Sequence, residues 1–359
     1  MNITIIGGGN IGTLMAVEFA SKGHEITVCA SDARRWSGHL EAYDTDDRLV
    51  YAGDLACVTD DLALSVRDAE LVWVTHPTFM LETLSGKLEP VLAPSQWLGF
   101  VPGNDAELVF GWHVANGGTL FGLQRVHSVA RLRERGRSVC MMGRRTSGLH
   151  IAAIPSSQVT TLAKVVEGLF DLPVTTLPNY LVETLTPSNP ILHTTRIRSM
   201  FRDWKPGACF DRNILFYEEW DIPSSELLLA CDDELQRVCR ALESATGLDL
   251  SGVRSLREHY ESPDAPSITA KISGIPGFKG LRSPMKEVAP GQWVPDFDSR
   301  YFKADFPYGL KVIKDIAALA DVATPAIDEV YGWYRDVAGD TTEFDAVPKT
   351  LEELVALYT

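Results

Sequence analysis

The sequence has no cysteine pair and no cysteine–histidine cluster with the spacing of a metal site. Its six cysteines are scattered along 359 residues, a pattern typical of reduced thiols in a reducing compartment. It also has no run of about eighteen apolar residues, the length that crosses a bilayer. The segment before Gly7 is too short for a secretory signal peptide. These absences predict a cytoplasmic protein without disulfides, metal or membrane span.

Positive charge is also scarce. The chain has 33 Lys and Arg against 48 Asp and Glu, a formal net charge of −15 and a sequence pI near 5.0. Phosphate backbones and anionic leaflets repel such a surface, so nucleic acid and membranes are not expected as partners. Anionic small molecules remain as partners wherever cationic side chains or helix N-termini gather locally. A homodimer is a possible assembly that the sequence does not decide.

The first half of the chain alternates apolar strands with helices. Helical patterns cover residues 11–22 and 157–170. The expected strands are 3–6, 25–30, 70–75, 97–101, 138–142 and 149–154. Continuous apolar strands between helices are typical of a parallel sheet covered on both faces. The pattern therefore predicts an α/β, doubly wound Rossmann domain.

After Pro187 helical periodicity dominates, and a chain of this length favours two domains. The expected helices are 190–201, 224–245, 308–321 and 325–337. The Pro- and Gly-rich stretch 262–299 is interpreted as loops crossing a cleft. The prediction is a dinucleotide-binding Rossmann domain over residues 1–187, followed by a mainly α-helical substrate domain over 188–359.

A glycine fingerprint follows the first strand. In Gly7-Gly8-Gly9-Asn10-Ile11-Gly12 the glycines at 7, 9 and 12 form G-x-G-x-x-G. The first permits a tight turn, the second lets the backbone approach a pyrophosphate, and the third allows close helix–strand packing. The helix that starts at Asn10 and Ile11 would direct free N–H groups at the phosphates. This segment is predicted to bind a dinucleotide.

The end of the second strand bears on which dinucleotide is bound. NAD-specific folds usually carry an acidic residue there for the ribose 2′-hydroxyl, but this chain has Ala30. Ser31, Arg34 and Arg35 follow, and guanidinium groups match a 2′-phosphate bidentately. The segment favours NADP over NAD. Asp32 keeps NAD open, because a slightly longer strand would place its carboxylate at the ribose.

Three residues of the second half could together support the reduction of a carbonyl or imine. A histidine such as His193 can give or take a proton as hydride arrives on the substrate carbon. Asp305 could fix its tautomer, and Arg300 could hold a substrate carboxylate as a fork. Taken singly, His193 could be a satisfied helix-start histidine, and Arg300 and Asp305 could form a structural ion pair. No metal is expected, since no cluster has ligand spacing.

Two motifs make the chain resemble a known family. They are Asn189-Pro190-x-x-His193 and, far downstream, Ser299-Arg300-Tyr301-Phe302-x-x-Asp305-x-Pro307-Tyr308-Gly309-Leu310. Together with Val101-Pro102-Gly103 and the segment 121–126, they resemble the opine dehydrogenase family of octopine and nopaline dehydrogenases and bacterial N-(carboxyethyl)amino acid dehydrogenases. The resemblance extends over essentially the whole chain.

The resemblance implies NAD(P)H-dependent reductive condensation of an amino acid with a 2-oxo acid. It also implies that His193 and Asp305 act as a proton relay, with Arg300 near the oxo-acid carboxylate. The chain departs from the family after Gly103 and over 126–130, which borders the family's amino-acid pocket, so the amine donor stays open. There His127 could be a second titrating group or a packed surface histidine.

Two other functions remain as alternatives. A 2-oxo or 2-hydroxy acid reductase of the ketopantoate type would have the same architecture and need no amine. A non-catalytic dinucleotide sensor would use the second domain for partner contacts. The joint presence of a histidine, a carboxylate and an arginine favours an enzyme. The amino acid, the oxo acid and the stereochemistry are not specified by the sequence.

Overall fold

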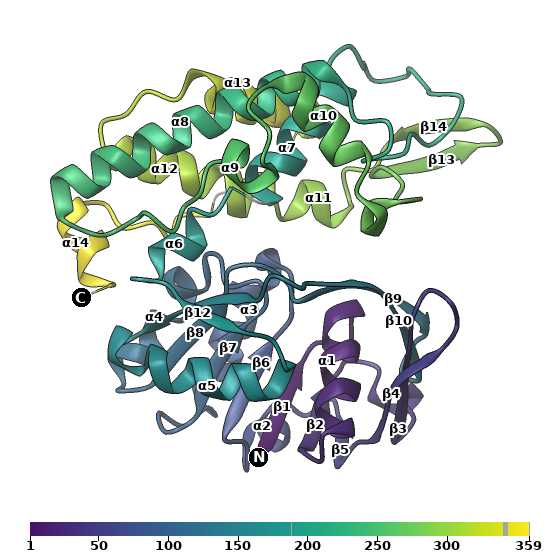
Figure 1. Cartoon of the computed structure of the whole chain (residues 1–359), viewed down its shortest axis with the longest axis vertical. Helices are drawn as coiled ribbons and strands as arrows, with labels where there is room; N and C mark the ends of the chain where they lie inside the picture. Colours follow the sequence, from purple (N-terminus) through teal and green to yellow (C-terminus); the bar gives the residue numbers. More distant parts are fainter. Residues whose placement is uncertain (188, 340–343, 359) are drawn as a thin grey trace. The chain divides into compact units, whose positions relative to one another are not determined.

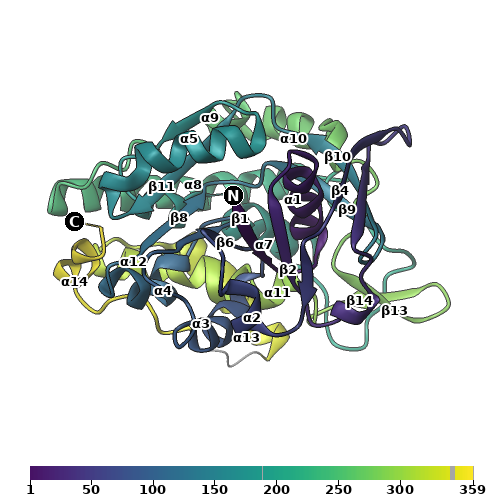
Figure 2. The same cartoon turned by 90° about the horizontal axis from the view of Figure 1, so that it is seen from below.

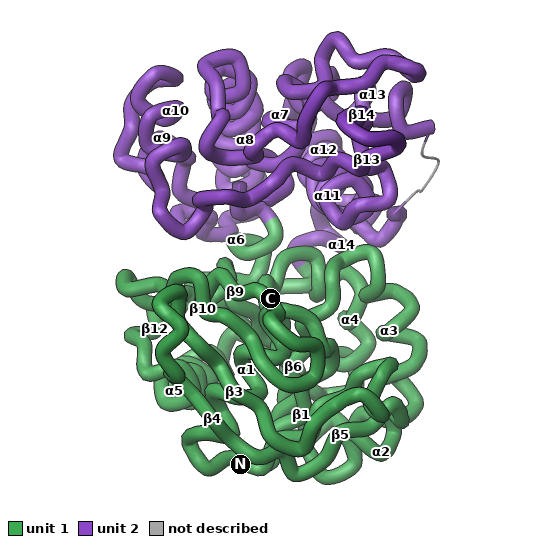
Figure 3. The backbone as a smooth tube through the Cα atoms, turned by 90° about the vertical axis from the view of Figure 1, so that its right-hand side faces the viewer, with its two compact units in different colours: residues 1–184, 356–359 green, residues 185–355 purple. Residues whose placement is uncertain are grey.

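The structure is a computed structural model that describes residues 1–187, 189–339 and 344–358 and divides into two compact units (Figure 3). Unit 1 comprises Met1–Thr184 and the chain's end from Ala356, and unit 2 comprises Leu185–Val355. Ser188, the first residue of the expected second domain, lies outside the described residues. The chain's end groups with unit 1 because Tyr358 is buried there and its hydroxyl donates to Glu107 at 2.8 Å.

Unit 1 is built around an eight-stranded sheet with the order β12-β11-β8-β7-β6-β1-β2-β5. Its strands are β1 (Asn2–Ile6), β2 (Glu25–Cys29), β5 (Cys57–Thr59), β6 (Leu71–Val74), β7 (Trp97–Phe100), β8 (Thr119–Leu123), β11 (Leu149–Ile154) and β12 (Val174–Thr176). From β5 to β8 the strands are parallel and follow the Rossmann order 3-2-1-4-5-6. The predicted α/β Rossmann fold is confirmed.

The expectation of a wholly parallel sheet is wrong at one edge. Strand β11 pairs antiparallel with β8 and parallel with β12. A parallel neighbour needs a crossover connection, usually a helix. The chain between β8 and β11 contains a pair of strands and no helix, so β11 returns in the opposite direction.

Helices cover both faces of this sheet, with α1 and α5 on one and α2, α3 and α4 on the other (Figures 1 and 2). The helices of unit 1 are α1 (Asn10–Ser21), α2 (Leu62–Val66), α3 (Leu81–Leu88), α4 (Ala106–Ala115), α5 (Val159–Phe170) and α6 (Leu181–Thr184). Phe19 of α1 meets Phe170 of α5 edge-to-face at 5.0 Å between ring centroids. The ring of Trp73 in β6 also meets Phe170 edge-to-face, at 6.1 Å between centroids, so this strand and the two helices share one core.

A second sheet packs against α1, and the sequence analysis did not anticipate it. Its order is β4-β3-β10-β9, from β3 (His39–Tyr43), β4 (Leu49–Asp54), β9 (Ser128–Glu134) and β10 (Ser138–Arg144). The expected strand 138–142 belongs to this sheet. Three of these strands are only partly buried and carry charged residues, which weakens the apolar alternation that a strand prediction depends on.

The described part of unit 2 is mainly helical, as predicted. Its helices are α7 (Asn189–Met200), α8 (Ile222–Thr246), α9 (Leu256–Tyr260), α10 (Ala265–Ser273), α11 (Arg300–Lys303), α12 (Lys311–Leu319), α13 (Pro325–Ala338) and α14 (Leu351–Ala356), the last of which ends in unit 1. A hairpin of β13 (Met285–Ala289) and β14 (Gln292–Pro295) completes it. Helix α7 packs on α8 and α13, and α12 also lies against α8 (Figure 1).

Two expectations for unit 2 need correction. The stretch 262–299 is not all loop, because it contains α10 and the hairpin. Asp264 caps α10 and Pro266 lies in its first turn, where proline is compatible with a helix, and Gly291 supplies the left-handed conformation of the hairpin turn. The helix expected over 308–321 begins as a π-helical turn, Phe306–Leu310, and ends at Leu319. No helix among the described residues is long and apolar enough to cross a membrane.

Candidate active site

The glycine-rich turn between β1 and α1 is tightly built. Gly7 has a φ of 121°, a conformation that favours glycine. A Cβ on Gly12 would lie 1.9 Å from the carbonyl oxygen of Gly7, so α1 could not approach the turn this closely with any other residue there. A Cβ on Gly9 would meet no atom within 4 Å. The turn therefore has an open side at Gly9, next to the first N–H groups of α1.

Asn10 and Ile11 begin α1. The Asn10 side chain accepts a hydrogen bond from the Leu132 N–H at 2.9 Å, which ties the start of α1 to β9 of the second sheet. Ile11 packs its side chain against the apolar core of unit 1. What these two residues offer a ligand is consequently their backbone N–H groups at the helix start.

Ser31, Arg34 and Arg35 are exposed just beyond β2. The two arginines lie in a 3₁₀ turn, Ala33–Arg35. No hydrogen bond or ion pair joins either guanidinium to another residue of the described chain. Both groups are therefore available to an anion.

The Asp32 carboxylate, by contrast, already has partners. It accepts a hydrogen bond from Trp36 Nε1 at 3.1 Å and another from the Arg135 guanidinium. The hydrogen bond from Arg135 is the largest of the effects that lower the pKa of Asp32. A ribose hydroxyl would have to compete with these donors for the carboxylate.

In unit 2 the second turn of α7 begins with His193, which is 5% exposed. Its Nδ1 lies 2.8 Å from Oδ2 of Asp305, two residues beyond the end of α11. The ring of Tyr301 packs on the imidazole at 4.7 Å between centroids. The structure thus brings together the predicted histidine and carboxylate. Because a carboxylate only accepts hydrogen bonds, Nδ1 carries the proton.

A close approach of two segments positions this pair. Asp305 directly precedes the π-helical turn Phe306–Leu310, which is buried and contacts α7. A Cβ on Gly309 would lie 2.9 Å from the Pro190 side chain, in the first turn of α7. Glycine at 309 lets the two segments meet, and that contact holds Asp305 at His193.

Tyr217 completes the set of hydrogen bonds to the imidazole. Its hydroxyl lies 2.9 Å from His193 Nε2, and the residue is 5% exposed. Tyr217 is not among the site residues predicted from the sequence, although the aromatic cluster of Phe216, Tyr217 and Trp220 was a usable signal. Burial raises the pKa of Tyr217 well above its usual value, so the phenol keeps its proton at neutral pH.

Arg196 holds the segment that carries Tyr217. It is buried one turn after His193 on α7, and its Nε donates to the Phe216 carbonyl at 3.0 Å. Its other nitrogens donate to the Glu219 carbonyl at 2.6 Å and to the Ser224 hydroxyl at 3.1 Å. The backbone on both sides of Tyr217 is therefore bound to the helix of His193.

Arg300, the first residue of α11, lies over the ring of Tyr301, with 5.3 Å from guanidinium carbon to ring centroid. No ion pair joins it to another described residue, so the alternative of a structural ion pair with Asp305 is not what the structure shows. Because Tyr301 also touches His193, the guanidinium belongs to the same cluster and is free to bind an anion.

Unit 1 contains buried carboxyl groups that the sequence analysis did not single out. Burial raises the pKa of Glu107 to about 7 and the pKa values of Asp105 and Glu183 well above their usual range. Glu107 accepts hydrogen bonds from the Thr184 hydroxyl at 2.6 Å and from the Tyr358 hydroxyl at 2.8 Å. Asp105 and Glu107 lie where the chain departs from the family's glycine-rich pattern. That departure drew attention to the segment, but it did not indicate that its carboxyl groups are buried.

His127 is not a surface residue. It is fully buried on the Phe170 ring, at 4.6 Å between centroids, and burial lowers its pKa to about 3. It therefore stays neutral near pH 7, and the hypothesis of a second titrating group at this position is not supported.

Comparison with known proteins shows which proteins the chain is similar to. A family model described as the alpha-helical domain of NAD/NADP octopine/nopaline dehydrogenase matches residues 176–338. An opine dehydrogenase from Haliotis discus hannai is 26% identical over 94% of this chain and 90% of its own length. The chain is thus similar to opine dehydrogenases over almost its whole length, and the resemblance seen in its motifs is confirmed. This similarity indicates an NAD(P)-dependent oxidoreductase.

Further comparisons agree with the similarity to opine dehydrogenases. A tauropine dehydrogenase from Arabella iricolor is 27% identical over 94% of this chain and 91% of its own length. A solved structure of octopine dehydrogenase with NADH and L-arginine has a TM-score of 0.82 at 24% identity, covering 99% of this chain and 94% of that one. At this identity the structural match shows the shared fold.

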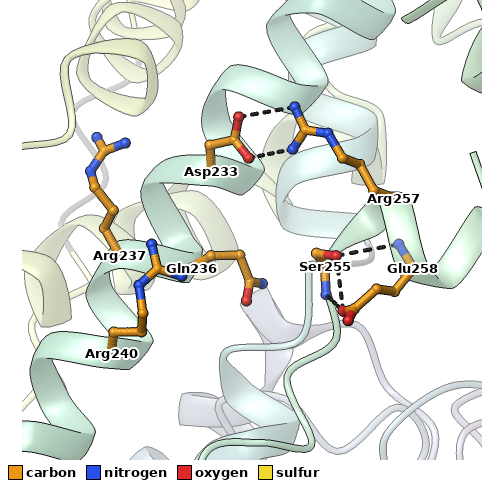
Figure 4. A pocket seen from close by; sticks show the side chains of 7 residues that line it. All are labelled: Asp233, Gln236, Arg237, Arg240, Ser255, Arg257 and Glu258. Carbon is orange, nitrogen blue, oxygen red and sulfur yellow. Dashed lines mark hydrogen bonds and ion pairs between the residues drawn. The ribbon is translucent and has the colours of Figure 1, made fainter. Parts of the chain in front are cut away.

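A surface pocket of about 410 Å³ lies elsewhere in the helical unit (Figure 4). It is lined by Asp233, Gln236, Arg237, Arg240, Ser255, Arg257 and Glu258. Arg257 pairs with both carboxylate oxygens of Asp233, and Ser255 with Glu258 forms the capping box of α9. None of the predicted site residues lines this pocket.

Proposed function

We propose that this protein catalyses NAD(P)H-dependent reductive condensation of an amino acid amine with a 2-oxo acid, giving an opine by reduction of an imine. The observation that carries this proposal is the contact of His193 with Asp305 beside Arg300, in a unit that matches the helical domain of octopine and nopaline dehydrogenases. Reduction of an imine needs a proton donor and a group that fixes the substrate, and these residues supply both.

Each residue of the cluster has a distinct task. Asp305 accepts from Nδ1 of His193, which fixes the tautomer and stabilises the imidazolium when it forms. His193 holds the proton that the reduced substrate requires. Arg300 binds the oxo-acid carboxylate through paired N–H donors, which a guanidinium supplies in a fixed fork.

The Rossmann unit has the features that a dinucleotide requires. The open side at Gly9 accommodates a pyrophosphate against the backbone, and the N–H groups at Asn10 and Ile11 face it at the start of α1. We assign Gly7, Gly9, Asn10, Ile11 and Gly12 to this role. When bound, the reduced nicotinamide supplies the hydride.

We further propose that NADP is preferred to NAD. Ser31, Arg34 and Arg35 are exposed beyond β2, where a 2′-phosphate would bind. The Asp32 carboxylate that would favour a ribose hydroxyl is already bonded to Trp36 and Arg135. We also propose that the enzyme works in the cytoplasm on small-molecule substrates.

A substrate matrix tests the reaction. Amino acids are combined with 2-oxo acids in the presence of NADPH or NADH, and nucleotide oxidation is followed at 340 nm. We expect oxidation that requires both the amine and the oxo acid. His193→Ala, purified in parallel, is the control for background oxidation.

The matrix also separates the alternatives. Oxidation with an oxo acid alone would identify a 2-hydroxy acid reductase and overturn the condensation. Ketopantoate reductases share the fold at a lower TM-score than octopine dehydrogenase does, which favours the condensation. Nucleotide binding without oxidation in any combination would identify a dinucleotide sensor instead.

A further inference from the structure

Both ring nitrogens of His193 are occupied within unit 2. Nδ1 is bound to Asp305 and Nε2 to the hydroxyl of Tyr217, at 2.8 and 2.9 Å. Nδ1 must stay with the carboxylate to keep its proton, so Nε2 is the nitrogen that can exchange a proton with another group. At that nitrogen the neighbouring polar atom is the phenol oxygen. A substrate can receive a proton from His193 either through this hydroxyl or after displacing it.

The surroundings of Tyr217 resist displacement. Its ring is stacked on Phe278 at 4.0 Å between centroids and an interplanar angle of 18°. The Tyr217 ring is also parallel to the ring of Trp220, with 6.3 Å between centroids and an interplanar angle of 8°. Arg196 binds the backbone carbonyls of residues 216 and 219 on either side of it. The hydroxyl is therefore held at Nε2 by a packed ring and a fixed backbone.

The hydroxyl also lies within reach of the charge proposed to bind substrate. The positive charge of Arg300 counteracts part of the effect of burial, which raises the pKa of Tyr217. Arg300, Tyr301 and His193 form one contiguous cluster through the Tyr301 ring. A carboxylate bound at Arg300 would place the adjacent C=N or C=O bond of the substrate near the phenol.

We propose that Tyr217 is a catalytic residue, whose hydroxyl hands the proton to the substrate and is recharged by His193. The assignment rests on the proposed reduction. As the substrate carbon accepts hydride, the π electrons of the C=N bond move to nitrogen. The Tyr217 O–H bond breaks and its proton forms the new N–H bond. The phenol oxygen takes the Nε2 proton of the imidazolium, which leaves neutral His193 bound to the Asp305 carboxylate.

This relay accounts for both observed hydrogen bonds. With imidazolium present, Nε2–H donates to the phenol oxygen and the O–H group points at the substrate. After proton transfer, neutral Nε2 accepts from the O–H group across the same 2.9 Å contact. The Asp305 carboxylate at Nδ1 stabilises the imidazolium form of His193.

Tyr217→Phe tests the proposal because it removes one oxygen and keeps the stacked ring. Turnover should fall roughly a hundredfold, the usual scale for losing a general acid, while the KM for the oxo acid stays close to wild type. Tyr331→Phe is the matched control. Tyr331 is a buried tyrosine of the same unit whose hydroxyl has no hydrogen-bond partner in the described chain, so this variant should keep wild-type turnover.

The outcomes separate this proposal from the proposed function. A carbonyl oxygen needs the same proton as an imine nitrogen, so the comparison holds for whichever substrate the wild type reduces. Wild-type turnover or a gain in Tyr217→Phe would mean that the hydroxyl only blocks Nε2, and would overturn the relay. The ¹⁵N signals of His193, recorded without substrates, provide a readout independent of activity. The Nε2 signal should shift in Tyr217→Phe but not in Tyr331→Phe, and an unchanged signal would also overturn the relay.

Discussion

His193 and Asp305 are 112 positions apart in the sequence, yet Nδ1 of the imidazole lies 2.8 Å from a carboxylate oxygen. The contact depends on Gly309, because a side chain there would collide with Pro190 in the first turn of α7. A turn of π-helix follows Asp305, an irregularity often found at functional sites. The pair is thus a product of tertiary packing around two short motifs.

Replacing His193 with alanine should lower turnover by about a hundredfold or more, the usual scale for loss of an acid–base group. Nucleotide affinity should be retained, since the glycine-rich turn lies in the other unit. Steady-state kinetics with a parallel nucleotide titration checks both expectations. Turnover that matches wild type across the pH range would remove His193 from the mechanism.

Asp305→Asn is the companion change. The amide is nearly isosteric, so the fold should persist, and an amide oxygen can still accept from Nδ1. Turnover should fall less than in His193→Ala, because orientation survives while the charge that stabilises the imidazolium is lost. A melting curve establishes the fold, and kinetics gives the ratio. A larger loss than for His193→Ala would indicate that Asp305 has a direct role.

Arg300→Lys should raise the KM for the oxo acid. An ammonium cannot reproduce the two parallel N–H bonds that a guanidinium makes to a carboxylate. The KM of each substrate is measured with the other saturating. If the amino-acid KM rises while the oxo-acid KM is unchanged, Arg300 belongs to the pocket for the amine.

The elements that carry the predicted cluster were accessible from sequence because their signals are local. Asn189-Pro190 before a helical pattern marks a helix start, and the strand–turn–helix context of Gly7 to Gly12 marks the Rossmann turn. The structure places His193 at the start of the second turn of α7 and Gly9 directly before α1. At these two places the local sequence motif and the observed secondary structure agree.

Other parts depend on contacts that local patterns do not encode. Tyr217 lies in an irregular segment, and only Arg196 and the stack with Phe278 bring its hydroxyl to Nε2. The strands of the second sheet are half-exposed, which obscures their alternation. The hairpin at 285–295 lies in a stretch whose prolines and glycines suggested loops. In the sequence, Glu107 cannot be told from an ordinary surface glutamate, because its burial depends on the tertiary structure.

Glu107 should make stability depend on pH. Its pKa of about 7 in the folded protein lies above the unfolded value near 4.5, so the folded state retains a proton that the unfolded chain loses between these values. The stabilising contribution is complete below about pH 4.5 and is lost as pH rises through about 7. A shift of this size corresponds to roughly 3 kcal/mol.

Glu107→Gln removes that ionisation and keeps an oxygen that can accept from Thr184 and Tyr358. Relative to wild type, its melting temperature should be higher at pH 8 than at pH 4.5. Glu89→Gln, an exposed change of the same kind, is the control for loss of one carboxylate. Parallel pH profiles of wild type and Glu107→Gln would show that the buried acid does not ionise over this range.

Cofactor choice can be tested at the end of β2. The chain has Ala30 where NAD-specific folds carry an acid, and Arg34 and Arg35 are exposed a few residues on. Losing one guanidinium–phosphate contact should cost on the order of 1.5–3 kcal/mol, the range for hydrogen bonds to charged groups. The kcat/KM for NADPH should then fall roughly tenfold to a hundredfold in Arg34→Ala or Arg35→Ala.

NADH has no 2′-phosphate, so its kinetics should be almost unchanged in both variants, which makes each variant its own control. Both nucleotides are titrated against wild type and the two variants under identical substrate conditions. The opposite preference is also informative, because the Asp32 carboxylate is held by Trp36 and Arg135. If wild type prefers NADH, Asp32 must bind the ribose despite these donors, and Asp32→Asn should then weaken NADH more than NADPH. The proposed NADP preference would be wrong, while the tasks of His193, Asp305 and Arg300 would stand.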